Sequence, residues 1–393
     1  MISTWVDTAS ELEALVDRAR AAPALAVDTE FHRERTYRPV LGLVQIAAED
    51  WIALVDPIAV DITPIIEVFR ETPLVLHAGD QDLGIFANEF RVVPQEVFDT
   101  QIAAGFLGMT SPSLASLVER RLAVVLEKGD QLSDWTRRPL STAACEYAAA
   151  DVEHLLTLAA SLRAELGELG RLKWAEEECA EATQRAVQEV DASSAWWRIK
   201  GARRLRGPSA GVAQEVGVWR ERLASEKNRN PRSVLPDLAY AAIVARPPKT
   251  SDDVRRLRGM EGRQHLSAAD ATSLLQAIER GRELPKDQLN LPPEPVRSRV
   301  SAAVVAVLSA YANQRATDVN LDPSLLATRS DITSFASGQP CRLDHGWRSE
   351  LIATSLQTLL SGDASLRIEG KRIVVELPSD GRDAPAPDSD ELE

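Results

Sequence analysis

Short apolar runs alternate with helix-like stretches over the first 165 residues of the chain. Five runs rich in β-favouring residues are separated by stretches in which apolar residues recur every three or four positions. The sequence AAEDW between the second and third runs indicates a tight hairpin, and the later strands alternate with helices. This pattern predicts a mixed α/β domain over residues 1–165. The expected strands lie at residues 24–31, 42–48, 51–57, 74–79 and 96–100, and the expected helices at 8–20, 61–71, 82–90 and 113–122.

The rest of the chain is predicted to be mainly helical, with proline at the boundaries. Residues 166–195 are rich in charge, which is typical of an exposed helical linker. Proline bounds the helices in NPRSVLPD and ARPPKTSDDV, and these helices predict a first helical domain over 196–290. The proline-rich stretch RELPKDQLNLPPEPV predicts a linker to a second helical domain over 297–375. Residues 378–393 are expected to be a disordered acidic tail, because they have no means of burying a core.

Length and composition suit a protein of several domains with real hydrophobic cores. The chain has 393 residues, of which 44% are hydrophobic, and this length favours two to four domains. No apolar run approaches the roughly 18 residues of a membrane span, and the start ISTWVDTASELEAL lacks the pattern of a signal peptide. We therefore expect a cytoplasmic protein that does not bind membranes. Cys145, Cys179 and Cys341 are odd in number and far apart, which argues against both a disulfide framework and a zinc site.

The net charge of −14 is distributed unevenly along the chain. Residues 1–160 contain twelve basic and twenty-five acidic side chains, whereas residues 196–235 contain ten basic and three acidic ones. A concentrated basic stretch is the electrostatic pattern of a phosphate-binding surface. A solvated helix face or a protein-docking surface would have the same composition. Arg203, Arg204 and Arg206 lie together in KGARRLRG and are the candidates for phosphate contact.

The run ALAVDTEF places two acids on one face of a predicted strand. Side chains alternate along a strand, so Asp28 and Glu30 point to one face while Thr29 points to the other. Two neighbouring carboxylates repel each other unless positive charge lies between them, and carboxylate oxygens select hard cations such as Mg²⁺ or Mn²⁺. A lone pair of this kind is more often structural or solvated, so further acids are needed.

Further acids come from two predicted helices. Asp80 and Asp82 follow the strand and turn of LVLHAGDQD, where an acid at a helix start also serves as a cap. Tyr147 and Asp151 in CEYAAADVEHLL lie one turn apart on an alanine-rich helix. Four carboxylates from these elements could surround two cations roughly 3.5–4 Å apart, as in phosphodiester cleavage.

The motifs VDTEF, HAGDQD and EYAAAD, in this order, resemble the three exonuclease motifs of the ribonuclease D family. This family belongs to the tyrosine-bearing branch of the DEDD superfamily. GLVQIA and SDWTRRPL are similar to the family's sequences near the first and third motifs. WWRIKG, NPRSVLPDLAYAAIVARPP and VRRLRGM resemble its C-terminal HRDC module. The resemblance covers nearly the whole chain, and residues 297–375 resemble an HRDC module more loosely. It implies a ribonuclease H-like α/β exonuclease domain with a mixed sheet, followed by mainly α-helical HRDC-type domains.

The resemblance also implies roles for individual residues. It makes Asp28, Glu30, Asp82 and Asp151 the ligands of two divalent metal ions, Mg²⁺ or Mn²⁺, with Asp28 bridging both ions. Asp82, and not Asp80, occupies the acid position of the second motif. Tyr147 would orient the attacking water through its hydroxyl group.

Four further residues have weaker assignments. Trp135 could stack on a base and Arg138 could hold a phosphate, although packing and capping would explain both equally well. His77 is expected to be a hydrogen-bonded structural residue. Phe31 suits either a wedge against the terminal base or the core.

The implied function is a metal-dependent 3′→5′ exoribonuclease that releases nucleoside 5′-monophosphates. Its expected partner is RNA with a free 3′ end, with transfer RNA precursors as the first candidate, and the protein is expected to be a monomer. One alternative is a 3′→5′ DNA exonuclease of the same superfamily, because recognition of the 2′-hydroxyl is not visible in sequence. The other is a nucleic-acid-binding scaffold with an inactive nuclease domain, against which the intact set of four acids and a tyrosine argues.

Overall fold

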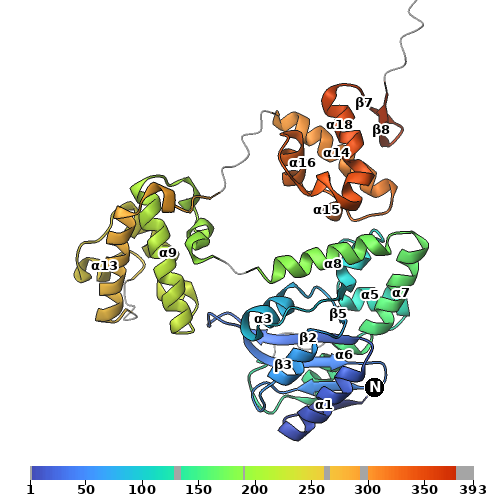
Figure 1. Ribbon diagram of the computed structural model, residues 1–393, viewed down its shortest axis with the longest axis horizontal. Coiled ribbons are helices and arrows are strands. Elements are labelled where there is room, and N and C mark those ends of the chain that lie inside the picture. The colour runs from blue at the N-terminus through green and yellow to red at the C-terminus, as the bar shows by residue number, and fades with distance from the viewer. Residues whose placement is uncertain (1, 128–133, 189–190, 261–265, 293–299, 378–393) are drawn as a thin grey trace, which may run out of the picture. The chain divides into compact units, whose positions relative to one another are not determined.

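The structure is a computed structural model, shown as a ribbon in Figure 1. It describes residues 2–127, 134–188, 191–260, 266–292 and 300–377, so the expected acidic tail lies outside the described residues. Each helix within these ranges is too short or too polar to cross a membrane.

The described residues divide into two compact units. The first unit comprises Met1–Thr100, Leu114–Ser161 and Cys179–Glu294, and the second comprises Gln101–Ser113, Leu162–Glu178 and Pro295–Glu393. This division differs from the expected boundary at residue 165 and the expected linker at 166–195. Residues 162–178 instead pack with the C-terminal residues, through the side-chain contacts of the second unit given below.

A six-stranded mixed sheet forms the centre of the first unit, in the order β1-β4-β3-β2-β5-β6. Strands β2, β3 and β4 pair antiparallel, whereas β1, β5 and β6 join the sheet through parallel pairing. The predicted hairpin joins β3 to β4, and the Ala48 amide donates to the Trp51 carbonyl at 3.0 Å. The edge strand β1 was not predicted from the sequence. The strands are β1 (Ser3–Val6), β2 (Leu25–His32), β3 (Val40–Ala47), β4 (Ile52–Val55), β5 (Leu74–Leu76) and β6 (Val97–Asp99).

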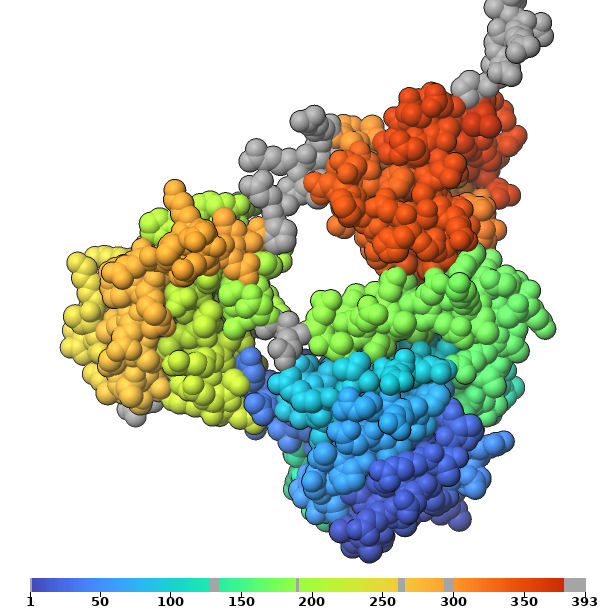
Figure 2. Space-filling model, in the orientation of Figure 1, coloured from blue at the N-terminus to red at the C-terminus, as the bar shows by residue number. Residues whose placement is uncertain are grey.

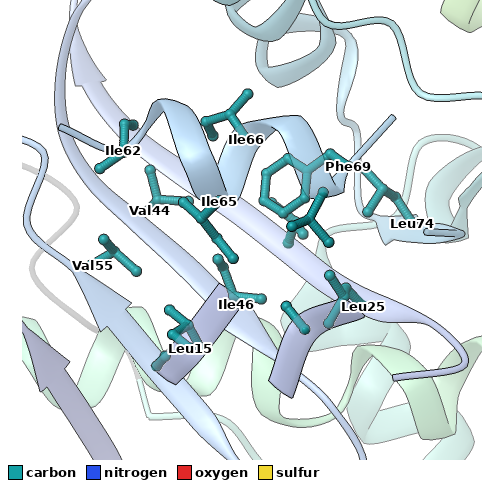
Figure 3. Packing of buried hydrophobic residues seen from close by; sticks show 14 of the residues in the cluster. Leu15, Leu25, Val44, Ile46, Val55, Ile62, Ile65, Ile66, Phe69 and Leu74 are labelled. Atoms are coloured by element: carbon teal, nitrogen blue, oxygen red, sulfur yellow. The ribbon is translucent and has the colours of Figure 1, made fainter. Parts of the chain in front are cut away.

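Helices cover both faces of this sheet. One face packs against α1, α2 and α3, and Figure 3 shows Val44 and Ile46 of β3 beside Ile65 of α2 in this core. The other face packs against α6, which contacts β2, β3 and β4. Because side chains alternate along each strand, this second face displays Asp28 and Glu30. The helices are α1 (Ala9–Ala21), α2 (Thr63–Val68), α3 (Asp80–Phe90), α4 (Thr100–Gly105), α5 (Leu114–Leu122), α6 (Thr142–Glu153), α7 (Leu155–Glu168) and α8 (Leu172–Ala186).

The first unit also contains the first helical domain. Its two long helices, α9 and α13, cross closely, because a Cβ added to Gly211 would lie only 2.2 Å from the Gly281 carbonyl oxygen. The buried amide of Gln214 ties α9 to the residues after α13: it donates to the Gln288 carbonyl at 3.0 Å and accepts from the Asn290 amide at 2.7 Å. The elements are η1 (Ala192–Arg198), η2 (Ala202–Arg204), α9 (Pro208–Glu226), α10 (Pro231–Val234), α11 (Asp237–Ala245), α12 (Ser251–Arg255), α13 (Ala268–Glu283) and η3 (Lys286–Gln288).

The second helical domain belongs to the second unit and ends in a β-hairpin. The hairpin was not predicted, although SLRIEGKRIVVE has two β-favouring runs, and Gly370 adopts the left-handed φ of 62° that its tight turn requires. The identification of this domain as HRDC-like stays a prediction. Its elements are α14 (Ala302–Asp318), α15 (Pro323–Leu326), α16 (Arg329–Ala336), η4 (Arg342–Asp344), α17 (Gly346–Arg348), η5 (Ser349–Ala353), α18 (Thr354–Ser361), β7 (Ser365–Glu369) and β8 (Arg372–Glu376).

Trp347 anchors the second helical domain to residues 101–113 and 162–178 of the same unit. Its ring stacks on Trp174 at 5.6 Å between centroids and meets Phe106 edge-on at 5.0 Å. Beside it, Arg348 donates to Glu178, and each side chain of this ion pair is only 3% exposed. The corresponding surfaces, green for α7 and α8 and red for the C-terminal domain, touch in Figure 2. The second unit therefore has one core built from segments far apart in the sequence.

Candidate active site

Strand β2 brings the first two acids of the site together. Asp28 and Glu30 lie on the face of the sheet that α6 covers, and Thr29 points to the opposite face. In the antiparallel register with β3, Asp28 stands opposite Gln45, and Glu30 stands opposite Leu43. The pairing of β2 with β3 thus fixes the spacing between the carboxylates of Asp28 and Glu30.

Helix α6 brings Tyr147 and Asp151 over the same face. The helix starts at Ser141, whose hydroxyl accepts a hydrogen bond from the Ala144 amide at 3.1 Å. Buried alanines hold the helix against the sheet, which leaves Tyr147 and Asp151 one turn apart at its edge. The Tyr147 hydroxyl donates a hydrogen bond to the Asp151 carboxylate.

Asp28, Glu30 and Asp151 form a compact acidic cluster. Each offers a carboxylate oxygen, and these oxygens all lie within 4.8 Å of one another. Burial raises the pKa of Glu30 to about 7, and the charges of Asp151 and Asp82 add to this effect. Burial also raises the pKa of Asp151 to about 6, against the hydrogen bond from Tyr147 that lowers it. The pKa of Asp28 is raised well above its ordinary value, first by burial and then by the charges of Asp82, Asp151 and Glu30.

Asp82 reaches the site from the first turn of α3. The turn before this helix is tight: Ala78 has a left-handed φ of 56°, and a Cβ on Gly79 would lie 2.6 Å from the Leu76 side chain. The Asp99 carboxylate holds the turn by accepting from the Ala78 amide at 3.1 Å and from the Gly79 amide at 2.8 Å. Asp82 itself is 6% exposed.

The carboxylate of Asp82 accepts a hydrogen bond from the Thr29 hydroxyl. Among the described residues, the group within 4.8 Å does not include Asp82. Asp82 nevertheless lies close enough for its charge to raise the pKa values of Asp28 and Glu30, and burial raises its own pKa to about 6. Asp80, in contrast, is exposed at the start of α3.

These four carboxylates suit a hard divalent cation. Buried acids that raise one another's pKa values are stabilised in their ionised forms when positive charge lies between them. Oxygen ligands of this type select Mg²⁺, Mn²⁺ or Ca²⁺. The acidic cluster therefore fits the metal chemistry that the sequence motifs imply.

Trp135 and Arg138 lie in positions that do not match their expected contacts with nucleic acid. Trp135 is 2% exposed, and its ring lies 6.3 Å from that of Tyr147, so no face is open for a base. Arg138 forms a forked ion pair with Asp56, with N–O distances of 2.5 and 2.7 Å, and also donates to the Gly42 carbonyl. Packing and internal hydrogen bonds occupy both side chains in this structure, and their contact with nucleic acid stays a prediction.

The other weaker candidates are placed as follows. Arg203, Arg204 and Arg206 are exposed around η2, where Arg203 donates to the Trp197 carbonyl and Arg206 donates to the Arg203 carbonyl. His77 shares a 2.9 Å hydrogen bond with the Thr100 hydroxyl. Phe31 is partly buried against the core of the first unit.

Thr29, Gln45 and Asp99 were not identified from the sequence as residues of the site. Thr29 and Asp99 hold Asp82 and its turn, and Gln45 stands beside Asp28. For Gln45, the sequence signal that could have identified it is a single polar residue inside the otherwise apolar run GLVQIAA.

The exonuclease domain and the first helical domain of the first unit each match a known protein family. Residues 3–167 match the model of a 3'-5' exonuclease family, and residues 209–278 match the HRDC domain. Ribonuclease D of Jannaschia sp. (strain CCS1) is 36% identical over 384 residues, which cover 95% of this chain and 99% of that protein. Ribonuclease D of Escherichia coli (strain K12) is 34% identical over 373 residues, with coverage of 90% and 97%.

A solved structure extends the likeness to the fold. The crystal structure of Escherichia coli RNase D, described as an exoribonuclease involved in structured RNA processing, aligns with a TM-score of 0.79 and 32% identity. The alignment covers 92% of this chain and 99% of that one. The expected fold class and the expected enzyme class, a 3′→5′ exonuclease, are thereby confirmed. The chain belongs to the ribonuclease D family of 3′→5′ exoribonucleases.

Proposed function

We propose that this protein trims the 3′ ends of structured RNA precursors, with transfer RNA precursors as the preferred substrate. The support is its membership of the ribonuclease D family and its likeness to an Escherichia coli enzyme involved in structured RNA processing. RNA with a free 3′ end is the partner, and the protein acts as a monomer.

The observation that carries the mechanism is the cluster of Asp28, Glu30 and Asp151 within 4.8 Å, with Asp82 beside it. These four carboxylates would hold two divalent cations, Mg²⁺ or Mn²⁺. Two such cations stabilise the attacking and leaving oxygens of a phosphodiester during in-line displacement. The products would be nucleoside 5′-monophosphates.

Tyr147 would have a different role from the four acids. Its hydroxyl donates to Asp151 at the edge of the cluster, where an attacking water would enter. From this position the hydroxyl orients the water towards the terminal phosphate. The ring of Trp135 lies beside that of Tyr147, with 6.3 Å between the centroids.

The test uses RNA and DNA oligonucleotides of the same sequence, labelled at the 5′ end and incubated with Mg²⁺. A descending ladder on RNA is expected, whereas an equally fast ladder on DNA would support the DNA exonuclease instead. Binding without cleavage would support the inactive scaffold. A transfer RNA precursor with a 3′ extension should be trimmed faster than an unstructured RNA with the same 3′ sequence, and equal rates would contradict the preferred substrate.

Two acids in the first turn of α3 provide a matched pair of variants. Asp82→Asn should abolish cleavage, because it removes a ligand from the buried site. Asp80→Asn should cleave at the rate of the parent chain, because Asp80 is exposed. The reverse result would show that the metal ligand of the second motif is Asp80.

A further inference from the structure

Gln45 has a buried amide without a hydrogen-bond partner in the described parts of the chain. Its side chain is 0% exposed, and neither its Nε2 nor its Oε1 is paired. Buried polar groups in folded proteins are almost always hydrogen-bonded, and an unpaired one destabilises the folded state. Because the unpaired amide of Gln45 destabilises the fold, its presence at a buried position of β3 needs an explanation other than stability.

The position of Gln45 places this amide beside the acidic cluster. Gln45 lies on the central strand β3, directly opposite Asp28 on β2 and Leu54 on β4. Residues opposite each other on antiparallel strands have Cβ atoms about 4.5–5.5 Å apart and point to the same face. Glu30 is a diagonal neighbour on this face, within reach of a long side chain. The polar neighbours of Gln45 on β2 are thus two of the four acids.

We propose that Gln45 is a positioning residue, which holds the carboxylate of Asp28 in the orientation that binds metal. This proposal rests on the metal site of the proposed function. Carboxylates that ligate metals are themselves hydrogen-bonded by neighbouring groups, which orient the oxygen that faces the metal. The Nε2 group of Gln45 could donate to one oxygen of Asp28 and leave the other oxygen for a cation. In this structure the amide of Gln45 has no hydrogen-bond partner among the described residues.

The neutral charge of glutamine suits this role. A lysine at residue 45 would neutralise Asp28 and compete with the cations, and a glutamate would add to the repulsion among the acids. An amide donates a hydrogen bond without changing the net charge of the site. The cost is a buried amide that has no partner among the described residues.

The test replaces Gln45 with methionine, which has a similar shape and no hydrogen-bonding amide. We expect the melting temperature of the metal-free Gln45→Met protein to equal or exceed that of the parent, because an unpaired buried amide is removed. We expect the Mg²⁺ concentration for half-maximal cleavage to rise about 10–100-fold. The Mg²⁺-induced rise in melting temperature should shift to higher Mg²⁺ by a similar factor. Gln45→Leu should behave in the same way, which would separate loss of the amide from a change of shape.

Gln214 provides the matched control. Its amide is also buried, at 5% exposure, but both of its polar atoms are hydrogen-bonded. Gln214→Met should lower the melting temperature and leave the Mg²⁺ dependence unchanged.

Two results would overturn the role of Gln45. The first is an unchanged Mg²⁺ dependence in Gln45→Met, and the second is a metal-free melting temperature that falls as it does in Gln214→Met. A parent chain that shows no Mg²⁺-induced stabilisation would instead contradict the proposed metal site itself.

Discussion

Replacing Asp151 with asparagine should make the metal-free protein more stable at pH 7 and leave its stability at pH 4 nearly unchanged. Asparagine keeps the shape of the side chain and an oxygen that can accept the hydrogen bond from Tyr147. What it removes is the charge. The substitution therefore isolates the cost of burying the ionised carboxylate of Asp151.

The size of the effect follows from the pKa of Asp151. Burial raises this pKa from 3.8 to about 6, and each pKa unit corresponds to about 1.4 kcal/mol, so the ionised group destabilises the folded state by roughly 3 kcal/mol. Well below pH 3.8 the group is protonated in both the folded and unfolded states, and no difference remains. As the pH rises from about 4 to about 6, the parent chain loses this stability, and the loss is complete above the folded pKa, whereas Asp151→Asn does not lose it. Because the four acids interact, their individual costs do not simply add.

The assay is urea unfolding of metal-free protein at several pH values between 4 and 7, followed by circular dichroism. The free energy of unfolding of the parent should fall over this range, and that of Asp151→Asn should fall less, by up to about 3 kcal/mol at pH 7. Saturating Mg²⁺ should remove the difference or reverse it, because the cation stabilises the ionised form. Glu146→Gln is the control, since Glu146 is exposed on the same helix. Equal pH profiles for the parent and Asp151→Asn would show that burying the ionised Asp151 carboxylate does not destabilise the fold.

Three further variants test other parts of the molecule. Tyr147→Phe should lower turnover by about 10²–10⁴-fold without changing the Mg²⁺-induced rise in melting temperature, and loss of that rise would make the tyrosine part of the metal site. Changing Arg203, Arg204 and Arg206 to alanine should weaken RNA binding and reduce the slope of log affinity against log salt by up to about 2, and an unchanged slope would exclude phosphate contact. Glu178→Gln should destabilise the second unit by about 3–5 kcal/mol in thermal unfolding, because it leaves a buried arginine without its ion pair. Cleavage of a short oligonucleotide by that variant should be unchanged, and a wild-type melting curve would contradict the importance of the pair.

The parts of the site that follow local rules were predictable from the sequence. Alternation along β2 put Asp28 and Glu30 on one face, and helical spacing put Tyr147 and Asp151 one turn apart. The position of Asp82 in the first turn of a helix after a glycine also followed from its neighbours.

The parts that depend on distant partners were not predictable in this way. The sequence around Arg138 predicts phosphate binding, but its side chain pairs with Asp56, which lies 82 positions away in the chain. The hydrogen bond from Thr29 to Asp82 likewise crosses 53 positions, and it uses the face of β2 that the acids do not occupy. Local patterns give the direction of a side chain, but its hydrogen-bond partner depends on how the whole chain packs.

The shared core around Trp347 has a consequence for shortening the chain. A chain ending before residue 300 would keep both matched family regions but lose the partner of Trp174 and Phe106. Both rings would then face water, beside a Glu178 without its arginine. Such a shortened enzyme should aggregate more readily than the full chain, even though every proposed catalytic residue would remain in place. The C-terminal domain thus covers aromatic side chains of residues 101–113 and 162–178 that a shortened chain would expose.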